Sequence, residues 1–527
     1  MKRKTIVWLL ALMAILLVGI GCWFCWHCQR RPLDMESGEF GLVAKRGRIL
    51  AADGSPLAYT VRKWSFHLDP EVAKFHGLDI QELSREIANG LELEPGDVAS
   101  AFSGKSRYVF LKDCGEDDAP NNWFVSQRGF TKRAGIICES IQDRVYPLGS
   151  AATAVVGFMI RGSHAEKPVG AGGLESACDR TLAGVNGVYD KDLSLKERNE
   201  RAAPKPGMDI QTTIVPEIQK AVAEALFAAC ATNGAESAFA LVMKVPSGEI
   251  AAIASFPTFD PSMRRDLDKW NPGMAVNRAS QALFEPGGLV KPLTYAIALD
   301  SGVLAEDSKI DQENGAWEYN GVTLRDETTN SLTIVEAIAS RANIAAGKTA
   351  CMVGPEKFHA ALRRFGFGSK TCASGMSGEE AGIIVDKPEL WDQTTAMRVG
   401  MGYGFASTGL QIAQAYATLA NHGMLVRPVL VKAVATNSVV QAISPSSADA
   451  ILRMLKSPMP STVQMCERDS VTGQTVYSPT NYIASCAGFV PADNPEYVVV
   501  VSFSKPQPAH TGEEVAKPAF SAISDAL

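Results

Sequence analysis

The pattern of apolar and polar positions divides the chain into three parts. Residues 5–26 form an uncharged, mostly apolar run that is long enough to cross a bilayer as a helix. The next part, up to about residue 205, mixes short strand-like and helix-like segments, and from residue 208 the patterns become longer. We therefore expect a membrane anchor with a cytoplasmic tip at 1–30, an intermediate region at 31–205 and a larger domain at 206–527.

The larger domain has strand patterns at both ends and helical patterns between them. Apolar runs predict a hairpin of strands at 238–245 and 250–254, and two further strands at 485–490 and 497–503. Helical spacing of apolar residues predicts helices at 216–229, 288–300, 333–350, 355–365 and 408–422. Strands on either side of a helical middle predict a sheet that is closed by both ends of the domain, which is an α+β fold.

Two polar segments predict a turn and a boundary. Asp53-Gly54 lies between apolar segments and predicts a tight turn. Residues 196–207 are charged, contain two prolines and lack bulky apolar side chains. This composition favours a linker before the larger domain, although the exposed tip of a hairpin explains it equally well.

The charges around the apolar run predict its orientation. Lys2, Arg3 and Lys4 precede the run and favour a cytoplasmic N-terminus, and no second run of that length follows. A cleaved signal peptide is the alternative, but the apolar stretch is too long for one and no Ala-x-Ala-like site follows it. We expect a single-pass membrane protein whose bulk lies outside the cytoplasm.

Composition argues against several classes of function. The net charge of −6 disfavours nucleic-acid binding. Eight of the eleven cysteines lie beyond the anchor, an even number that permits disulfides without pairing them. These eight form no Cys-x-x-Cys, and the seven histidines lack paired metal spacing, so we expect neither a metal site nor a cofactor.

The most informative local pattern is Glu285-Pro-Gly-Gly288-Leu-Val-Lys291-Pro292. A proline inside a helix costs a backbone hydrogen bond, so Pro292 must lie in the first turn of the helix that follows. Gly288 then lies near the helix N-terminus, one turn before Lys291. A serine at 288 would place its hydroxyl beside the lysine amine, which is the arrangement of an activated nucleophile. Glycine supplies no such atom.

Together with other segments, this pattern resembles the class B penicillin-binding proteins. The similar segments follow the family's order along nearly the whole chain, at 46–58, 144–149, 173–187, 247–257, 402–421 and 488–492. The resemblance implies a single-pass D,D-transpeptidase of the inner membrane that cross-links peptidoglycan on the periplasmic side. It also implies a pedestal, or dimerisation-like, domain at 31–205 and a transpeptidase domain at 206–527.

Two of the three catalytic motifs that the resemblance implies depart in ways that remove hydroxyl groups. The Ser-x-x-Lys motif aligns with Gly288 to Lys291, so the nucleophile is lost and the lysine is kept. The Ser-x-Asn motif aligns with Arg341-Ala342-Asn343, so only the asparagine remains. We expect Lys291 to pair with Glu285 or to hydrogen-bond Asn343, and Arg341 to fill the cleft or bind a carboxylate.

The third motif, Lys-Thr/Ser-Gly-Thr, departs as well. It aligns with Val471-Thr472-Gly473-Gln474, so the lysine that would bind the donor peptide's carboxylate is absent. No catalytic set is intact. The residues that remain for noncovalent substrate binding are Lys291, Asn343, Thr472 and Gly473.

Loss at three separate motifs predicts a non-catalytic pseudo-transpeptidase that acts as a scaffold or regulator in peptidoglycan synthesis or cell division. The partners that the resemblance implies are a polytopic glycan polymerase of the membrane, other division or elongation proteins, and weakly held peptidoglycan stem peptides. One alternative is an active D,D-transpeptidase or carboxypeptidase with an unrecognised nucleophile. Another is a membrane-anchored sensor of wall fragments or β-lactams.

Other candidate nucleophiles are weaker. Ser502-x-x-Lys505 is the only intact Ser-x-x-Lys, but it ends a strand pattern in which residues three apart face opposite sides. Ser280 is too far from Lys291 in sequence to share its helical turn. Cys486 is flanked by apolar residues, which predicts a core position.

Overall fold

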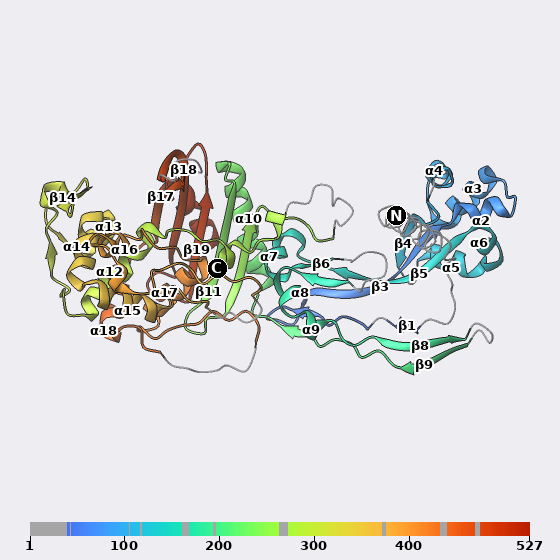
Figure 1. Cartoon of the computed structure of the whole chain (residues 1–527), viewed down its shortest axis with the longest axis horizontal. Helices are drawn as coiled ribbons and strands as arrows, with labels where there is room; N and C mark the ends of the chain where they lie inside the picture. The colour runs from blue at the N-terminus through green and yellow to red at the C-terminus, as the bar shows by residue number, and fades with distance from the viewer. Residues whose placement is uncertain are drawn as a thin grey trace, which may run out of the picture. The chain divides into compact units, whose positions relative to one another are not determined.

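The computed structural model describes ten segments of the chain (Figure 1). They are residues 39–42, 44–104, 106–115, 118–160, 168–192, 197–262, 272–371, 376–432, 440–468 and 475–527. The anchor predicted at 1–30 and the motif residues Val471, Thr472 and Gly473 lie outside them. Within these ten segments, no helix combines the length and the apolar character needed to span a membrane.

A small compact unit combines residues up to Lys45 with Gly184–Pro206. Its antiparallel sheet has the order β1-β8-β9, with β1 at Glu39–Leu42, β8 at Gly187–Asp192 and β9 at Glu197–Ala202. Of the two predictions for 196–207, a linker or part of a hairpin, the pairing of β9 with β8 contradicts the linker over β9 and supports the hairpin. A polar hairpin strand has the same composition as a linker, so sequence alone did not separate them.

The second unit begins at Arg46 with a sheet centred on β3 (Pro56–Leu68). Strand β3 pairs with β2 (Ile49–Leu50), β4 (Val109–Gly115) and β5 (Ile136–Val145), and β2 also pairs in parallel with β10 (Ile210–Gln211). The turn between β2 and β3 lies at Asp53-Gly54, as predicted, and Gly54 has a positive φ of 87°.

Five short helices pack on one another and on this sheet. They are α2 (Pro70–Phe75), α3 (Ile80–Leu91), α4 (Pro95–Ser103), α5 (Ala119–Ser126) and α6 (Arg128–Ala134). Their shared core contains Phe66 and Leu68 from β3, Ile87 and Leu91 from α3, and Phe102 from α4, all buried. Helices α2 and α3 begin at Asp69 and Asp79, whose carboxylates accept from backbone N–H groups of the first turn.

A buried ion cluster joins distant segments of the same unit. Glu175 is 0% exposed and accepts from Arg46 Nε and Arg144 Nε, both at 2.7 Å. Arg46 also pairs with Asp179 at 2.7 Å. Arg144 lies in β5, whereas Glu175 and Asp179 lie in α8 (Gly173–Ala177) and α9 (Asp179–Leu182). The other short elements of this part of the chain are η1 (Gly149–Ala151), α7 (Thr153–Val156), β6 (Phe158–Ile160) and β7 (Val169–Ala171).

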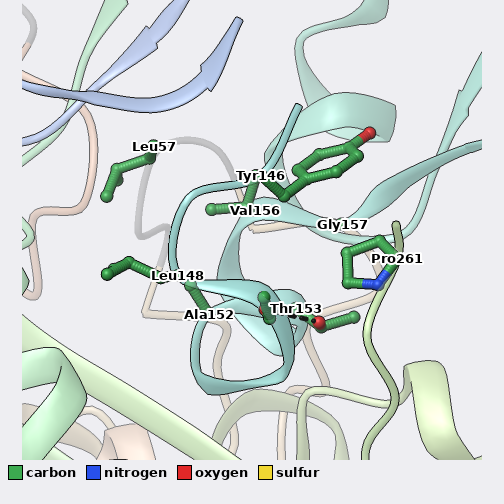
Figure 2. Close-up of a pocket in the computed structure, with 9 residues that line it drawn as sticks. Leu57, Tyr146, Leu148, Ala152, Thr153, Val156, Gly157 and Pro261 are labelled. Atoms are coloured by element: carbon green, nitrogen blue, oxygen red, sulfur yellow. Dashed lines mark hydrogen bonds between the residues drawn. The ribbon is translucent and has the colours of Figure 1, made fainter. Parts of the chain in front are cut away.

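Figure 2 shows a small hollow where this region meets the segment that follows β12 (Ile250–Phe256). Its lining is mostly apolar and consists of Leu57, Tyr146, Leu148, Gly149, Ala152, Thr153, Val156, Gly157 and Pro261. The Thr153 hydroxyl lies within 3.1 Å of Gly149 O and 2.8 Å of Phe259 O, so its hydrogen-bonding capacity is used inside the protein. We read the hollow as a packing joint between the two regions.

The C-terminal region is built on a five-stranded antiparallel sheet of order β12-β11-β19-β18-β17. Its strands are β11 (Ser237–Lys244), β12 (Ile250–Phe256), β17 (Met459–Arg468), β18 (Thr475–Val490) and β19 (Tyr497–Ser504). Because β11 pairs with β19, both ends of the domain close one sheet, which confirms that part of the α+β prediction.

Two helical layers cover the sheet. Helices α10 (Pro216–Asn233) and α19 (Lys517–Ser524) share one core with alternate strand residues such as Ala240 and Val242. The neighbouring Leu241 and Met243 point to the other face, toward a core shared with α17 (Gly409–Ala420). In Figure 1 the helices labelled α12 to α18 lie on the opposite side of the sheet from α10.

On that second face the helices predicted at 288–300, 355–365 and 408–422 are present, the one predicted at 333–350 is divided, and those at 278–281, 395–400 and 445–454 were not predicted. The segment 333–350 forms two helices, α13 (Ile334–Ser340) and α14 (Asn343–Val353), because Arg341 adopts a left-handed conformation with φ of 57° and ends α13. The others are α11 (Arg278–Gln281), η4 (Gly287–Val290), α12 (Lys291–Asp300), α15 (Pro355–Phe365), α16 (Thr395–Gly400) and α18 (Pro445–Met454).

Short elements complete the described fold. They are the strand pairs β13 (Lys309–Ile310) with β16 (Leu332–Thr333) and β14 (Ala316–Tyr319) with β15 (Val322–Arg325), and the single turns η3 (Pro272–Ala275), η5 (Glu313–Gly315), η6 (Pro388–Leu390) and η7 (Gly512–Ala516). The cysteines at 114, 138, 178, 230, 351 and 486 are free thiols.

Candidate active site

Gly288 lies where the sequence pattern places it, at the start of a helix. The turn η4 runs directly into α12, and Pro292 occupies the first turn, where its missing N–H costs nothing. The preceding Gly287 has a positive φ of 52° and donates to Gly402 O at 3.0 Å. Glu285 accepts from Gly404 N at 2.8 Å, so this side chain supports the turn instead of pairing with Lys291.

The backbone at 288 has room for a side chain. A Cβ at this position would lie 3.5 Å from Pro460 O and 3.6 Å from both Cβ and Oγ of Ser461, which are ordinary van der Waals contacts. Gly288 has no positive φ that would require glycine. The absence of a nucleophile therefore reflects the sequence and is not imposed by the local geometry.

Lys291 is held in a buried polar site. Lys291 is 3% exposed, and its Nζ donates to the backbone oxygen of Arg341 and, at 2.8 Å, to Asn343 Oδ1. Burial lowers the pKa of Lys291 to about 8, Asp326 opposes that shift and Arg341 adds to it. The expected hydrogen bond to Asn343 is thus present, and the amine ties α12 to the break between α13 and α14.

Arg341 contributes its backbone to the site and turns its side chain elsewhere. Its guanidinium pairs with Glu513 of η7 at 3.2 Å, and both side chains are 46% exposed. The second carboxylate oxygen of Glu513 accepts from Lys517. These contacts, led by the hydrogen bond from Lys517, lower the pKa of Glu513. Arg341 therefore bridges the helical layer and η7, which packs on the sheet.

The strand that contacts Gly288 is β17, through a residue that the sequence analysis missed. Ser461 Oγ accepts from Gly288 N at 2.8 Å and donates to Pro286 O at 3.2 Å. The next residue, Thr462, accepts from Gly512 N at 2.9 Å through Oγ1. The third motif aligns by its Thr-Gly pair with Thr472-Gly473, further along the chain, so no motif signal marked Ser461.

The structure keeps the other candidate nucleophiles apart from Lys291. Ser502 Oγ lies 2.8 Å from Ser485 Oγ within the sheet, whereas Lys505 pairs with Glu236 at 3.0 Å. Ser280 is fully buried and donates to Asn277 O. Cys486 is a core residue, as predicted, and burial raises the pKa of its thiol to about 12.

The described residues bring Gly288, Lys291, Arg341 and Asn343 together around the start of α12, with Ser461 opposite them. In the described segments no group of three or more His, Cys, Asp or Glu residues could hold a metal ion. The arrangement offers an amine and an amide, which can hydrogen-bond a ligand but cannot form an ester with it, and the Gly288 N–H is already bonded to Ser461.

Two protein families match this chain. Residues 42–212 match the family described as the penicillin-binding protein dimerisation domain, and residues 238–525 match the penicillin-binding protein transpeptidase domain. Similar curated proteins include penicillin-binding protein PbpB of Mycolicibacterium smegmatis, 28% identical over 85% of this chain and 74% of that protein. Another is peptidoglycan D,D-transpeptidase FtsI of Escherichia coli K12, 27% identical over 93% of this chain and 84% of its own.

Solved structures share the fold. Penicillin-binding protein 2X of Streptococcus thermophilus superposes with a TM-score of 0.74 at 18% identity, covering 92% of this chain and 79% of that chain. Penicillin-binding protein 3 of Mycobacterium tuberculosis, solved in complex with aztreonam, gives a TM-score of 0.66 at 22% identity, covering 92% of this chain and 96% of that chain.

Proposed function

The chain belongs to the class B penicillin-binding proteins, and on that premise we propose that it is a non-catalytic member that serves peptidoglycan synthesis and cell division as a scaffold or regulator. One observation carries the proposal. Position 288, one turn before Lys291, is glycine, and the lysine amine is hydrogen-bonded to Arg341 O and Asn343 Oδ1 with no hydroxyl to activate.

Loss of the nucleophile removes the covalent route through an acyl-enzyme. In serine enzymes that have lost the nucleophile, substrate binding and backbone donors alone still accelerate the reaction roughly 10³-fold over water. That rate is too low for wall synthesis. The retained Lys291 and Asn343, with Thr472 and Gly473 of the third motif, would at most hold a stem peptide noncovalently.

The nearest hydroxyl does not replace the lost serine. Ser461 is 6% exposed, and its Oγ is engaged by Gly288 N and Pro286 O. A nucleophile needs a base that accepts its proton. The Ser461 hydroxyl instead donates a hydrogen bond to a backbone carbonyl, which is not a base. This geometry supports the pseudoenzyme over an active transpeptidase with a relocated nucleophile.

The remaining parts of the proposal follow from the family. We place an anchor at 1–30 in the inner membrane with a cytoplasmic tip, a pedestal at 31–205 and a transpeptidase-like domain at 206–527, both periplasmic. The proposed partners are a polytopic glycan polymerase and division or elongation proteins, contacted through the anchor and pedestal.

Acylation by a β-lactam tests the proposal directly. The full-length protein is incubated with benzylpenicillin and its intact mass is measured, with a catalytic relative such as FtsI of Escherichia coli as the positive control. We expect no mass increase for this chain and one adduct for the control. A stoichiometric adduct on this chain would show that a working nucleophile exists and would overturn the proposal.

A further inference from the structure

The contacts around position 288 form a closed ring. Lys291 donates to Arg341 O, and the Arg341 side chain pairs with Glu513. The residue before Glu513 is Gly512, whose N–H donates to Thr462 Oγ1, and the adjacent Ser461 accepts from Gly288 N. From Gly288 the turn η4 leads back to Lys291.

The ring joins two layers of the domain. Gly288, Lys291 and Arg341 belong to the helical layer, whereas Ser461, Thr462 and η7 belong to the sheet side. The backbone of η7 is seated tightly there, since a Cβ on Gly512 would lie 2.4 Å from Ser461 O and 2.6 Å from Ser461 N. Because η7 cannot shift freely against β17, a contact from Arg341 to Glu513 holds the helical layer against the sheet.

One link of the ring differs from the others in strength and exposure. The bonds of Lys291, Ser461 and Gly512 involve backbone groups or side chains that are buried or partly buried. The Arg341–Glu513 link joins two long side chains that are each 46% exposed, so water and salt weaken it. It is therefore the link that opens first.

We propose that the Arg341–Glu513 pair is a latch that regulates access to the degenerate site. With the pair closed, the Lys291 residue is buried and Gly288 is partly buried between the two layers. With the pair open, the freed guanidinium can turn toward the site and lie beside the Asn343 amide, while the Gly288 N–H stays bonded to Ser461 until a ligand displaces it. A cation beside backbone and amide donors suits a peptide that ends in a carboxylate, which would compete with Glu513 for Arg341.

The latch rests on the proposed function, because it controls access to a cleft that binds a ligand without reacting with it. Its test does not use β-lactams, so the two proposals can fail separately. A Gly288→Cys substitution places a reporter thiol in the site, where a Cβ fits without a clash. In full-length protein, the rate of N-ethylmaleimide modification of the peptide containing position 288 is then measured by mass spectrometry. The rate reports how often the site is open.

Latch variants are compared on that reporter background. Glu513→Gln and Arg341→Gln change the local charge in opposite directions but both break the pair, so we expect both to raise the modification rate, by roughly two- to fivefold for an exposed pair. Glu306→Gln, which breaks the similarly exposed Arg453–Glu306 pair elsewhere, is the matched control and should leave the rate unchanged. Raising the salt concentration should speed modification of the reporter protein and have less effect in Glu513→Gln.

A second measurement uses the chain with Gly288 in place. Hydrogen exchange of the Gly288 and Gly512 amides should become faster in Glu513→Gln and not in Glu306→Gln. Equal thiol rates and equal exchange in latch and control variants would overturn the latch. Opposite effects of Glu513→Gln and Arg341→Gln on the thiol rate would also overturn it, because they would show a charge effect on the thiol alone.

Discussion

The amide N–H of Gly288 donates a 2.8 Å hydrogen bond to the hydroxyl of Ser461 on strand β17. In acyl-transfer enzymes, backbone N–H groups beside the nucleophile stabilise the oxyanion that develops on the substrate. Here this donor is already engaged by a side chain of the protein. The site therefore lacks the nucleophile and also has its backbone donor occupied.

Restoring the serine should not restore acylation. Gly288→Ser adds a side chain that meets only ordinary contacts, so the protein should fold with an unchanged melting temperature. On the alignment that the resemblance implies, the new hydroxyl would still lack the second and third motifs, where Arg341 and Val471 stand, and Ser461 would still engage Gly288 N. Intact-mass measurement with benzylpenicillin should show no adduct. Gly288→Ala is the control for the added Cβ, and adduct formation by the serine variant alone would mean that those two losses matter less than we infer.

Removing the Ser461 hydroxyl should destabilise the domain. Ser461→Ala leaves the partly buried Gly288 N without its acceptor, and the loss of such a hydrogen bond costs about 1 kcal/mol. Urea unfolding measures the loss. Ser100→Ala removes an exposed hydroxyl on α4 that bonds only within its own helix, so it should change stability little. A Ser461→Ala protein as stable as the Ser100→Ala protein would contradict a structural role for this bond.

Glu175 should be the least replaceable acid of the described pedestal region. Glu175→Gln leaves Arg46 and Arg144 buried with one fewer negative charge between them, and breaking a buried ion pair costs about 3–5 kcal/mol. Asp209→Asn is the control, because its pair with Arg48 is exposed and should cost less than about 1 kcal/mol. Thermal unfolding of the three proteins should rank them wild type, Asp209→Asn, then Glu175→Gln, and similar losses in both variants would refute the distinction.

The buried amine predicts a pH dependence of stability. The pKa of Lys291 falls from 10.5 to about 8 on folding, so between these values the unfolded chain binds more protons and the free energy of unfolding rises with pH. Below pH 8 the cost of burying the charge is present in full. Relative to Lys291→Met, the wild type should gain about 3 kcal/mol between pH 7.5 and 10.5.

Urea unfolding of both proteins at the two pH values measures this gain. The acceptors that Lys291→Met leaves unpaired are the same at both pH values, so their cost cancels in the comparison. A difference in stability that does not change with pH would mean that Lys291 titrates normally in the folded protein.

Much of the larger domain was predictable because its signals are local. Continuous apolar runs located β11, β12 and β19, and Pro216 and Pro292 marked the first turns of α10 and α12. The break at Arg341 was not predictable, because no glycine or proline marks it. The left-handed residue is an arginine, and its carbonyl is fixed by Lys291, which lies 50 positions away in sequence.

The candidate site was predicted in part for the same reason. Helical spacing predicted that Gly288 lies one turn from Lys291, and the order of the motifs predicted that Asn343 lies beside Lys291. Ser461 was missed because its place opposite Gly288 depends on the register of β17 against β18, in which Ser461 pairs with Ser485. Register depends on contacts across the sheet, which a single sequence does not reveal.

The Arg46–Glu175 contact has a consequence for the order in which the chain acquires structure. The two residues are 129 positions apart, and β2 must also wait for β10, since Ile49 pairs with Ile210. As the chain emerges during synthesis, β2 can pair with β3 at once, but its second partner β10 and the acid that pairs with Arg46 appear only after more than a hundred further residues. Long-range closure of this kind is slow, so the segment around Arg46 should reach its native position late, and it is the part most dependent on protection from misassembly while the rest is still being made.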